Sequence, residues 1–322
     1  MKKYKELEEH IFKSLSKASY KEPLKPYKFS GSAFPICPRI VALSDTTPFA
    51  FVSRPRSEAI LGNGTLNHAI IQKWLGNDGI LFGKFKNNKG IITPAPQYEQ
   101  IPFEKEKKLI DKGKLPPKYD SDKYNWVGKK GPLYNSDGTP MDYVEWRVYD
   151  KDCGFTGLVD AIIKMPDWDK YVVCDFKFVG EYSFNKYKHE GIEDDAPYRY
   201  QLNSYRYCLE GKLLNSHGKQ IPLADYMYLI VFKEDFLRNM KEESIQVIPI
   251  KFNPDLYLEQ KELYLKVQKK LKKRDLKYFT SHKSAICEVE ADCGYCNGKY
   301  ICFAPNSKEQ ISKLLKTKWG IK

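Results

Sequence analysis

The sequence predicts a mixed α/β protein in which helices flank a mixed sheet. Three strand-like runs follow one another at 143–149, 155–164 and 170–178, and the turn-prone segments DKDCG and MPDWD separate them. Helical patterns lie on both sides of these runs, at 57–75 and 197–210. Strands and helices do not alternate in a strict strand–helix–strand order, which favours a mixed sheet over a purely parallel one.

Length and charge limit the class of protein. The chain has 322 residues, enough for one large decorated domain, and its 54 Lys and Arg against 41 Asp and Glu give a formal net charge of +13. A polyanion is therefore a candidate partner, although a lysine-rich composition can also serve solubility alone. No window reaches the ~20 apolar residues that a membrane span needs. We expect a cytoplasmic protein with no membrane partner.

The first half of the chain combines helices with an irregular segment. The segment 1–55 begins with an amphipathic helix, reads unlike a signal peptide and contains Cys37. The helix at 57–75 follows. The segment 81–140 contains seven prolines, six glycines and twelve lysines against seven acidic residues. Such a composition is too punctuated for long regular elements and predicts an insertion on the surface.

The second half holds the expected catalytic core, 143–250, with further strands at 226–232 and 244–250. The last segment, 253–322, begins with a long helix, since Pro254 suits its first turn, and contains a cysteine-rich stretch. Ser307 and Gln310 have the spacing of a capping box and predict a short final helix. We expect all these segments to form a single decorated domain, 1–322.

Asp160, Asp175 and Lys177 are the candidate catalytic residues. The two aspartates lie at the ends of neighbouring strand-like runs with one turn between them, so strand pairing would bring their carboxylates together. Asp175 and Lys177 are two positions apart and point to one face of a strand. Carboxylates hold hard divalent ions, and a nearby ammonium can orient water or neutralise charge on a phosphate. A purely structural Asp–Lys ion pair is the alternative.

Two helical motifs accompany the carboxylates. Gly64 and His68 have G-x-x-x-H spacing, and Gln201 and Tyr205 lie one helical turn apart on one face. A lone histidine on a helix is more often a packed or solvated residue. Taken in order with Asp160 and D-x-K, however, these motifs resemble the RecB-like branch of the PD-(D/E)xK nucleases.

The resemblance implies a restriction-endonuclease-like core and a metal-dependent DNA exonuclease of recombination, repair or phage DNA processing. It also implies ligands for Mg²⁺ or Mn²⁺: His68, Asp160, Asp175 and the backbone carbonyl of Phe176. Lys177 would assist catalysis, and Gln201 and Tyr205 would contact DNA or support the site. Glu145 could reach the same site from the neighbouring run, but such a residue is more often solvated, so we do not assign it as a ligand.

The cysteines indicate a second metal centre. Cys293, Cys296 and Cys302 form C-x₂-C-x₅-C, and three thiolates in one loop suit an iron–sulfur cluster or Zn²⁺, each of which needs a fourth ligand. With one amino-terminal cysteine this pattern resembles the iron–sulfur RecB-like nucleases, including AddB nuclease domains and the CRISPR-associated spacer-acquisition exonucleases. That resemblance implies a [4Fe–4S] cluster that joins Cys37 to the trio. Cys287 is the competing fourth ligand.

The expected partners follow from this assignment. DNA with free ends, single- or double-stranded, is the substrate that the resemblance implies. The chain lacks G-x-x-x-x-G-K-[ST], so we expect no ATP-driven unwinding, and a separate helicase or annealing protein is a candidate partner. Two other functions remain open: a non-catalytic metal-cluster protein that binds nucleic acid, and a nuclease subunit that is active only in a larger complex.

Overall fold

The computed structural model describes most of the chain. The described residues are 21–22, 27–34, 36–44, 51–52, 55–77, 80–94, 99–100, 126–127, 135, 137, 139, 141–164, 168–192, 197–214, 220–281, 302 and 306–321. The chain divides into two compact units. We call Gly64–Tyr149 with Thr156–Pro254 the core unit, and Met1–Asn63 with Asp150–Phe155 and Asp255–Lys322 the terminal unit. Among the described helices, none has both the length and the apolar character that crossing a bilayer requires.

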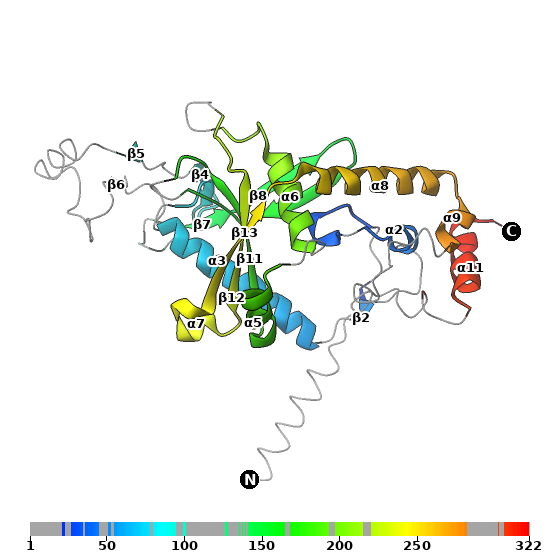
Figure 1. The fold of residues 1–322 in the computed structure, drawn as a ribbon, viewed down its shortest axis with the longest axis horizontal. Helices are drawn as coiled ribbons and strands as arrows, with labels where there is room; N and C mark the ends of the chain where they lie inside the picture. Colours follow the sequence, from blue (N-terminus) through cyan, green and yellow to red (C-terminus); the bar gives the residue numbers. More distant parts are fainter. Residues whose placement is uncertain are drawn as a thin grey trace, which may run out of the picture. The chain divides into compact units, whose positions relative to one another are not determined.

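A four-stranded mixed sheet forms the centre of the core unit (Figure 1). Its strands, in spatial order, are β10 (Ala161–Ile163), β11 (Val172–Val179), β12 (Tyr226–Lys233) and β13 (Ile245–Lys251). β11 is antiparallel to β10 and parallel to β12, and β13 is antiparallel to β12. The predicted mixed α/β architecture with a mixed sheet is therefore confirmed.

Shorter sheets accompany the central one. β8 (Trp146–Asp150) pairs with β9 (Phe155–Val159), and β3 (Lys84–Lys86) lies between β4 (Ile92–Pro94) and β7 (Asp142–Val144). The remaining pairs are β1 (Lys21–Glu22) with β2 (Phe51–Val52), and β5 (Glu99–Gln100) with β6 (Trp126–Val127). The run predicted at 143–149 is broken at Glu145, and the run at 155–164 is broken at Asp160. One break falls on the candidate ligand Asp160, and the other on Glu145, which the sequence analysis does not assign as a ligand.

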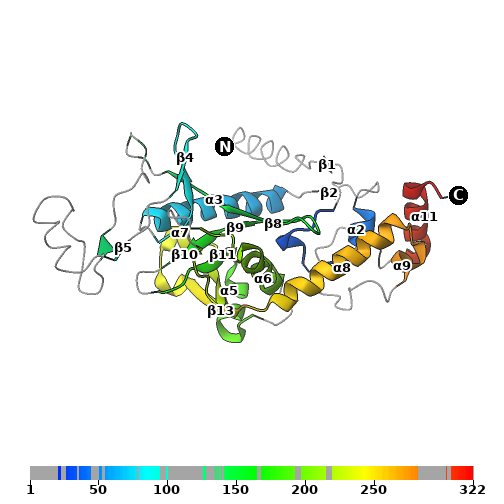
Figure 2. The same ribbon diagram turned by 90° about the horizontal axis from the view of Figure 1, so that it is seen from above.

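Helices cover the central sheet on both faces (Figure 2). They are α3 (Pro55–Asn77), α5 (Glu181–Glu190), α6 (Pro197–Leu209) and the short α7 (Phe236–Asn239). α6 packs on β11 and β12, while Ile71 of α3 belongs to the core cluster that contains Cys174 and Phe176 of β11. Alternate residues of a strand point to opposite faces, so Asp175 and Lys177 face the side that α6 covers. The helices predicted at 57–75 and 197–210 are confirmed.

The predicted insertion at 81–140 begins too early. Leu81 and Phe85 are 4% and 2% exposed and belong to the core cluster of the core unit. Leu81 forms an isolated bridge with Ile163, so this stretch extends the pairing at the edge of β10. The apolar residues Leu81 and Phe85 are too few, among the lysines and prolines of this segment, to give a recognisable strand pattern. The greater part of this segment lies outside the described residues.

The terminal unit combines segments from both ends of the chain. Its helices are α2 (Pro38–Leu43), α8 (Pro254–Lys272), α9 (Leu276–Thr280) and α11 (Ser307–Trp319), with the short turns η1 (Gly31–Ala33) here and η2 (Glu242–Ser244) in the core unit. Aromatic rings build its core, for example Phe29, which stacks on Tyr264 at 4.4 Å between ring centres. The long helix predicted after Asn253 is confirmed as α8. The amphipathic helix predicted at 1–20 lies outside the described residues.

The start of α11 differs from the predicted capping box. The helix does begin at Ser307, but Asn306 occupies the N-cap position and makes no side-chain capping hydrogen bond. Gln310 Nε2 instead donates to Asn306 Oδ1 at 2.5 Å. A capping box needs the hydroxyl residue at the N-cap itself, and here Ser307 is one position inside the helix.

Candidate metal centre

Asp160 lies at the bend between β9 and β10 and is 8% exposed. The backbone N–H of Phe176 donates to its Oδ2 at 2.8 Å, and His68 Nδ1 lies 3.5 Å from the same oxygen. Ala161 pairs with Cys174 in the antiparallel register. The adjacent residues, Asp160 and Asp175, therefore lie opposite each other. The structure therefore brings the two carboxylates to one place, as strand pairing predicted.

Asp175 is an almost fully buried carboxylate, 1% exposed, in the middle of β11. Its Oδ1 accepts a hydrogen bond from Gln201 Nε2 at 2.9 Å, and its Oδ2 lies 2.5 Å from Lys177 Nζ. Within the described chain, that Oδ2 has no hydrogen bond of acceptable geometry. Burial, followed by the charge of Asp160, raises the pKa of Asp175 to about 7. Additional positive charge beside such a buried carboxyl group stabilises its ionised form.

Lys177 faces the same group of carboxylates. Burial lowers the pKa of Lys177, but the charges of Asp175 and Asp160 outweigh that effect, so its pKa is raised. Its Nζ also lies 5.3 Å from the ring centre of Tyr198, within the range of a cation–π contact. The ammonium is therefore charged at neutral pH and fixed beside Asp175.

His68 projects from α3 toward Asp160. Its ring lies 5.8 Å from the ring of Phe176, edge-on, and 5.8 Å from that of Phe178. Burial lowers the pKa of His68, but the hydrogen bond to Asp160 and the charge of that carboxylate outweigh burial, so the pKa is raised. The motif histidine thus lies at the site rather than in solvent.

Gln201 and Tyr205 form one arm of the site. Gln201 Nε2 donates to Tyr205 Oη at 3.0 Å as well as to Asp175. Tyr205 is 4% exposed and packs against Gly157, where an added Cβ would lie 2.4 Å from Tyr205 Cε1. Of the two roles predicted for this pair, the burial of Tyr205 favours support of the site over contact with DNA.

Two residues outside the predicted set also belong to this region. Ligand atoms of Glu145, His68 and Asp160 all lie within 4.8 Å of one another. Gln72 Nε2 donates to Glu145 Oε1 at 3.0 Å and to the backbone carbonyl of Asp160 at 2.9 Å. The sequence analysis assigns neither residue to the site, since it expects Glu145 to be solvated. The signal for Gln72 was its position four residues after His68, on the same face of one helix.

The donor set fits a divalent cation. An imidazole and two carboxylates converge in the triad His68, Glu145 and Asp160, and Asp175 beside them has a buried oxygen without a hydrogen bond. Carboxylates suit Mg²⁺ and Mn²⁺, while an imidazole among them favours Mn²⁺ or another transition metal. Phe176 contributes its N–H to Asp160, and the ligand role of its carbonyl remains a prediction.

The predicted cysteine ligands are described only in part. Cys37 occupies the N-cap position of α2, and Cys302 is partly buried, whereas Cys287, Cys293 and Cys296 lie outside the described residues. The helices that flank this stretch contact α2. Arg39 Nε donates to the carbonyl of Phe279 at 3.1 Å, and Lys318 Nζ donates to that of Ala42 at 2.7 Å. The segment that carries Cys37 is thus packed against the carboxy-terminal helices of the terminal unit.

Comparison with protein-family models and with curated proteins gave no match to this chain. The family resemblance therefore rests on the four ordered motifs and on the cysteine spacing. The fold and the site together define a mixed α/β protein with a candidate site for a divalent cation.

Proposed function

We propose that this protein is a divalent-metal-dependent deoxyribonuclease of the RecB-like PD-(D/E)xK class, built on a restriction-endonuclease-like core. One observation carries the proposal: polar contacts connect residues of all the motifs in a continuous series. His68 contacts Asp160, which accepts a hydrogen bond from the backbone N–H of Phe176 in β11. The same strand carries Asp175 and Lys177, which pair with each other, and Gln201 donates a hydrogen bond to Asp175. A chance pattern of motifs gives no reason for such distant residues to meet.

The chemistry of the site suits phosphodiester hydrolysis. A bound divalent ion would polarise the phosphate and lower the pKa of an attacking water. Lys177 stays protonated beside Asp175, so its ammonium can stabilise negative charge that develops on the phosphate. Gln201 fixes the orientation of Asp175, and the Phe176 N–H fixes that of Asp160. The site is therefore preorganised before any substrate arrives.

DNA as substrate and exonuclease action come from the family resemblance, and the net charge of +13 supports a polyanionic substrate. Recombination, repair or phage DNA processing is the corresponding setting. A separate helicase or annealing protein would supply single-stranded or unwound ends, because the sequence has no nucleotide-binding loop of its own.

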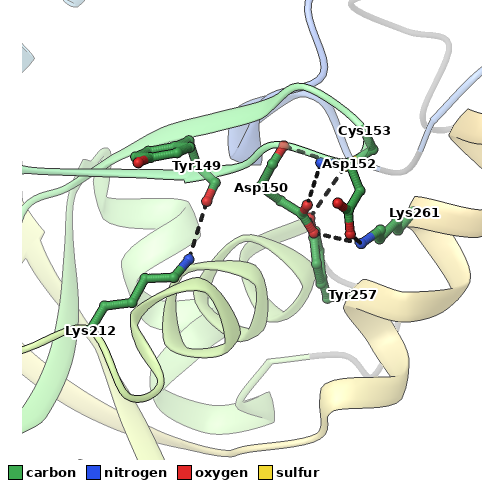
Figure 3. Close-up of polar contacts among 7 residues, drawn as sticks. All are labelled: Tyr149, Asp150, Asp152, Cys153, Lys212, Tyr257 and Lys261. Carbon is green, nitrogen blue, oxygen red and sulfur yellow. Dashed lines mark hydrogen bonds and ion pairs between the residues drawn. The ribbon is translucent and has the colours of Figure 1, made fainter.

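The proposal is tested by incubating labelled single- and double-stranded DNA with the protein and Mg²⁺ or Mn²⁺. Lys177→Ala should lower the cleavage rate by about 10²–10³-fold, because one donor to developing charge is lost. Lys212→Ala is the matched control. Lys212 follows Glu210 in the same spacing, but its Nζ donates to the Tyr149 carbonyl at 3.3 Å (Figure 3). Equal cleavage by Lys177→Ala and wild type would refute the assignment.

Two other outcomes define the rival functions. Salt-sensitive DNA binding without cleavage under either metal would indicate a non-catalytic nucleic-acid-binding protein. Cleavage that requires an added partner protein would indicate a nuclease subunit of a larger complex. In both cases the fold is unchanged, but the protein alone does not cleave DNA.

We also propose that a [4Fe–4S] cluster holds the two ends of the terminal unit together through Cys37, Cys293, Cys296 and Cys302. The packing of α2 against α9 and α11 supports this arrangement, because it keeps the segment of Cys37 beside the helices that flank the trio. Because such a site does not exist in the unfolded chain, the free energy of binding the cluster adds to the free energy of folding.

Anaerobic purification tests the cluster. The protein should be brown with broad visible absorption, and both Cys293→Ser and Cys37→Ser should lose that absorption. Colour that persists in Cys37→Ser and disappears in Cys287→Ser would move the fourth ligand to Cys287. A colourless protein with stoichiometric zinc would replace iron–sulfur by Zn²⁺.

A further inference from the structure

Glu145 lies at the break between β7 and β8, where a single residue leaves the strand pattern. Its side chain is half-buried, and its ligand atom lies within 4.8 Å of those of His68 and Asp160. Ligands around one Mg²⁺- or Mn²⁺-sized ion lie roughly 3–4 Å apart, because each is about 2.1 Å from the ion. Small side-chain movements would therefore let all three residues bind one cation.

Gln72 holds this group in place. Its amide nitrogen bridges Glu145 Oε1 at 3.0 Å and the Asp160 carbonyl at 2.9 Å, and the residue is 5% exposed. An amide is a neutral donor, so it orients the Glu145 carboxylate without neutralising its charge. The charge of Lys177 is directed to Asp175, 2.5 Å away. A cation bound here would face the carboxylates of Glu145 and Asp160, with His68 as a neutral imidazole ligand.

We propose that Glu145 is a ligand of the divalent cation, together with His68 and Asp160, and that Gln72 is its positioning residue. This inference rests on the proposed metal-dependent function and extends its ligand set, since the family resemblance gave Glu145 no role. Asp175 is held by Lys177 and Gln201 and lies beside the triad rather than within it. The imidazole ligand makes Mn²⁺ the preferred ion over Mg²⁺.

Mn²⁺ affinity of the full chain, measured by titration with electron paramagnetic resonance detection of unbound Mn²⁺, tests the inference. Glu145→Gln should weaken binding by about 100-fold and Gln72→Ala by about 10-fold, the range seen when metal ligands lose orientation or charge. Asp142→Asn is the matched control. Asp142 is an exposed carboxylate on β7 that pairs with Lys73 at 3.1 Å, and its loss should leave Mn²⁺ affinity unchanged.

Thermal unfolding without metal separates ligation from folding. Each variant should melt cooperatively well above the titration temperature, and Glu145→Asp should recover part of the affinity that Glu145→Gln loses. Wild-type Mn²⁺ affinity in folded Glu145→Gln would overturn the inference. If Glu145→Gln does not fold, wild-type affinity in Gln72→Ala overturns it and weakened affinity supports it.

The two proposals fail in different ways. Normal Mn²⁺ binding by Glu145→Gln, combined with loss of cleavage in Lys177→Ala, would remove Glu145 from the ligand set and leave the nuclease intact. Loss of Mn²⁺ binding in Glu145→Gln, combined with no DNA cleavage by wild type, would leave the cation site and remove the nuclease.

Discussion

Asp160 organises the candidate site at the scale of single residues. Its side chain accepts the Phe176 N–H and contacts His68, while its backbone carbonyl accepts the Gln72 amide. The residue also stands where the pairing of β9 ends and that of β10 begins. A carboxylate with this many fixed contacts has little freedom to rotate, which favours ligation of an ion in a defined geometry.

Gly157 leaves the space that the ring of Tyr205 occupies beside the site. A Cβ at this position would lie 2.4 Å from Tyr205 Cε1, so Gly157→Ala must displace the ring and disturb the hydrogen bond from Gln201. We expect a loss of about 1–3 kcal/mol in the free energy of unfolding, measured in urea. Gly64→Ala is the control. No atom lies within 4 Å of the corresponding Cβ, and alanine in a helix should be neutral or stabilise by about 0.5–1 kcal/mol.

Part of the candidate site could be predicted from the sequence. The meeting of Asp160 with Asp175 follows from strand pairing, and the shared face of Asp175 and Lys177 from the period of a strand. The contact between Gln72 and Glu145 depends on how α3 crosses the strands, which no local pattern encodes. Burial of Tyr205 was equally inaccessible, because it depends on a glycine far away in the sequence.

At the scale of elements, the turn between β8 and β9 is fixed to α8 within the terminal unit. Lys261 Nζ donates to Asp150 Oδ2 at 2.8 Å and to Asp152 Oδ2 at 3.0 Å, and Tyr257 Oη donates to Asp150 at 2.9 Å (Figure 3). Burial raises the pKa of Asp150, but the hydrogen bonds from Lys261, Asp152 and Tyr257 outweigh it, so the pKa is lowered. The turn thus depends on a charged Asp150.

Lys261→Ala should destabilise the protein by about 1–3 kcal/mol at pH 7, because Asp150 loses a charged donor. The pKa of Asp150 is lowered from its ordinary value of 3.8, so its stabilisation is complete above that pH and is lost as the pH falls through the lower folded value. Urea unfolding should show a constant difference from wild type between about pH 7 and pH 5, shrinking toward pH 3.

Lys266→Ala, an exposed lysine on the same helix, is the control and should stay within about 0.5 kcal/mol of wild type. A difference for Lys261→Ala that persists unchanged at pH 3 would contradict the role of the Asp150 charge. It would instead attribute the effect to the packing of the lysine stem.

The long elements were predictable, and so were the short strands inside the runs 143–149 and 155–164, but α5 and β3 were not. α3, α6 and α8 show helical patterns over several turns, and β11, β12 and β13 read as apolar runs. α5 was not predicted, because Phe184 is the one buried residue among its ten positions and the helix has no apolar stripe. β3 was not predicted, because Phe85 is the one buried residue of its three and a lysine stands on each side of it.

At the scale of the whole molecule, the net charge of +13 predicts the dependence of DNA binding on salt. If the protein neutralises four phosphates, its affinity for a short duplex should fall about 100-fold between 50 and 200 mM salt. Fluorescence anisotropy without divalent metal measures this directly. An affinity that changes less than about threefold would contradict electrostatic capture of the DNA backbone.

The central claim is metal-dependent hydrolysis of DNA at the site around Asp160. The most direct test is release of label from end-labelled DNA in the presence of Mn²⁺, with Asp169→Asn, an exposed aspartate of the same unit, as the control. The wild type and Asp169→Asn should release short products, while Asp160→Asn should be slower by about 100-fold or more, since a metal contributes several kcal/mol. Equal release by Asp160→Asn, or no release by the wild type with Mn²⁺, would contradict the account.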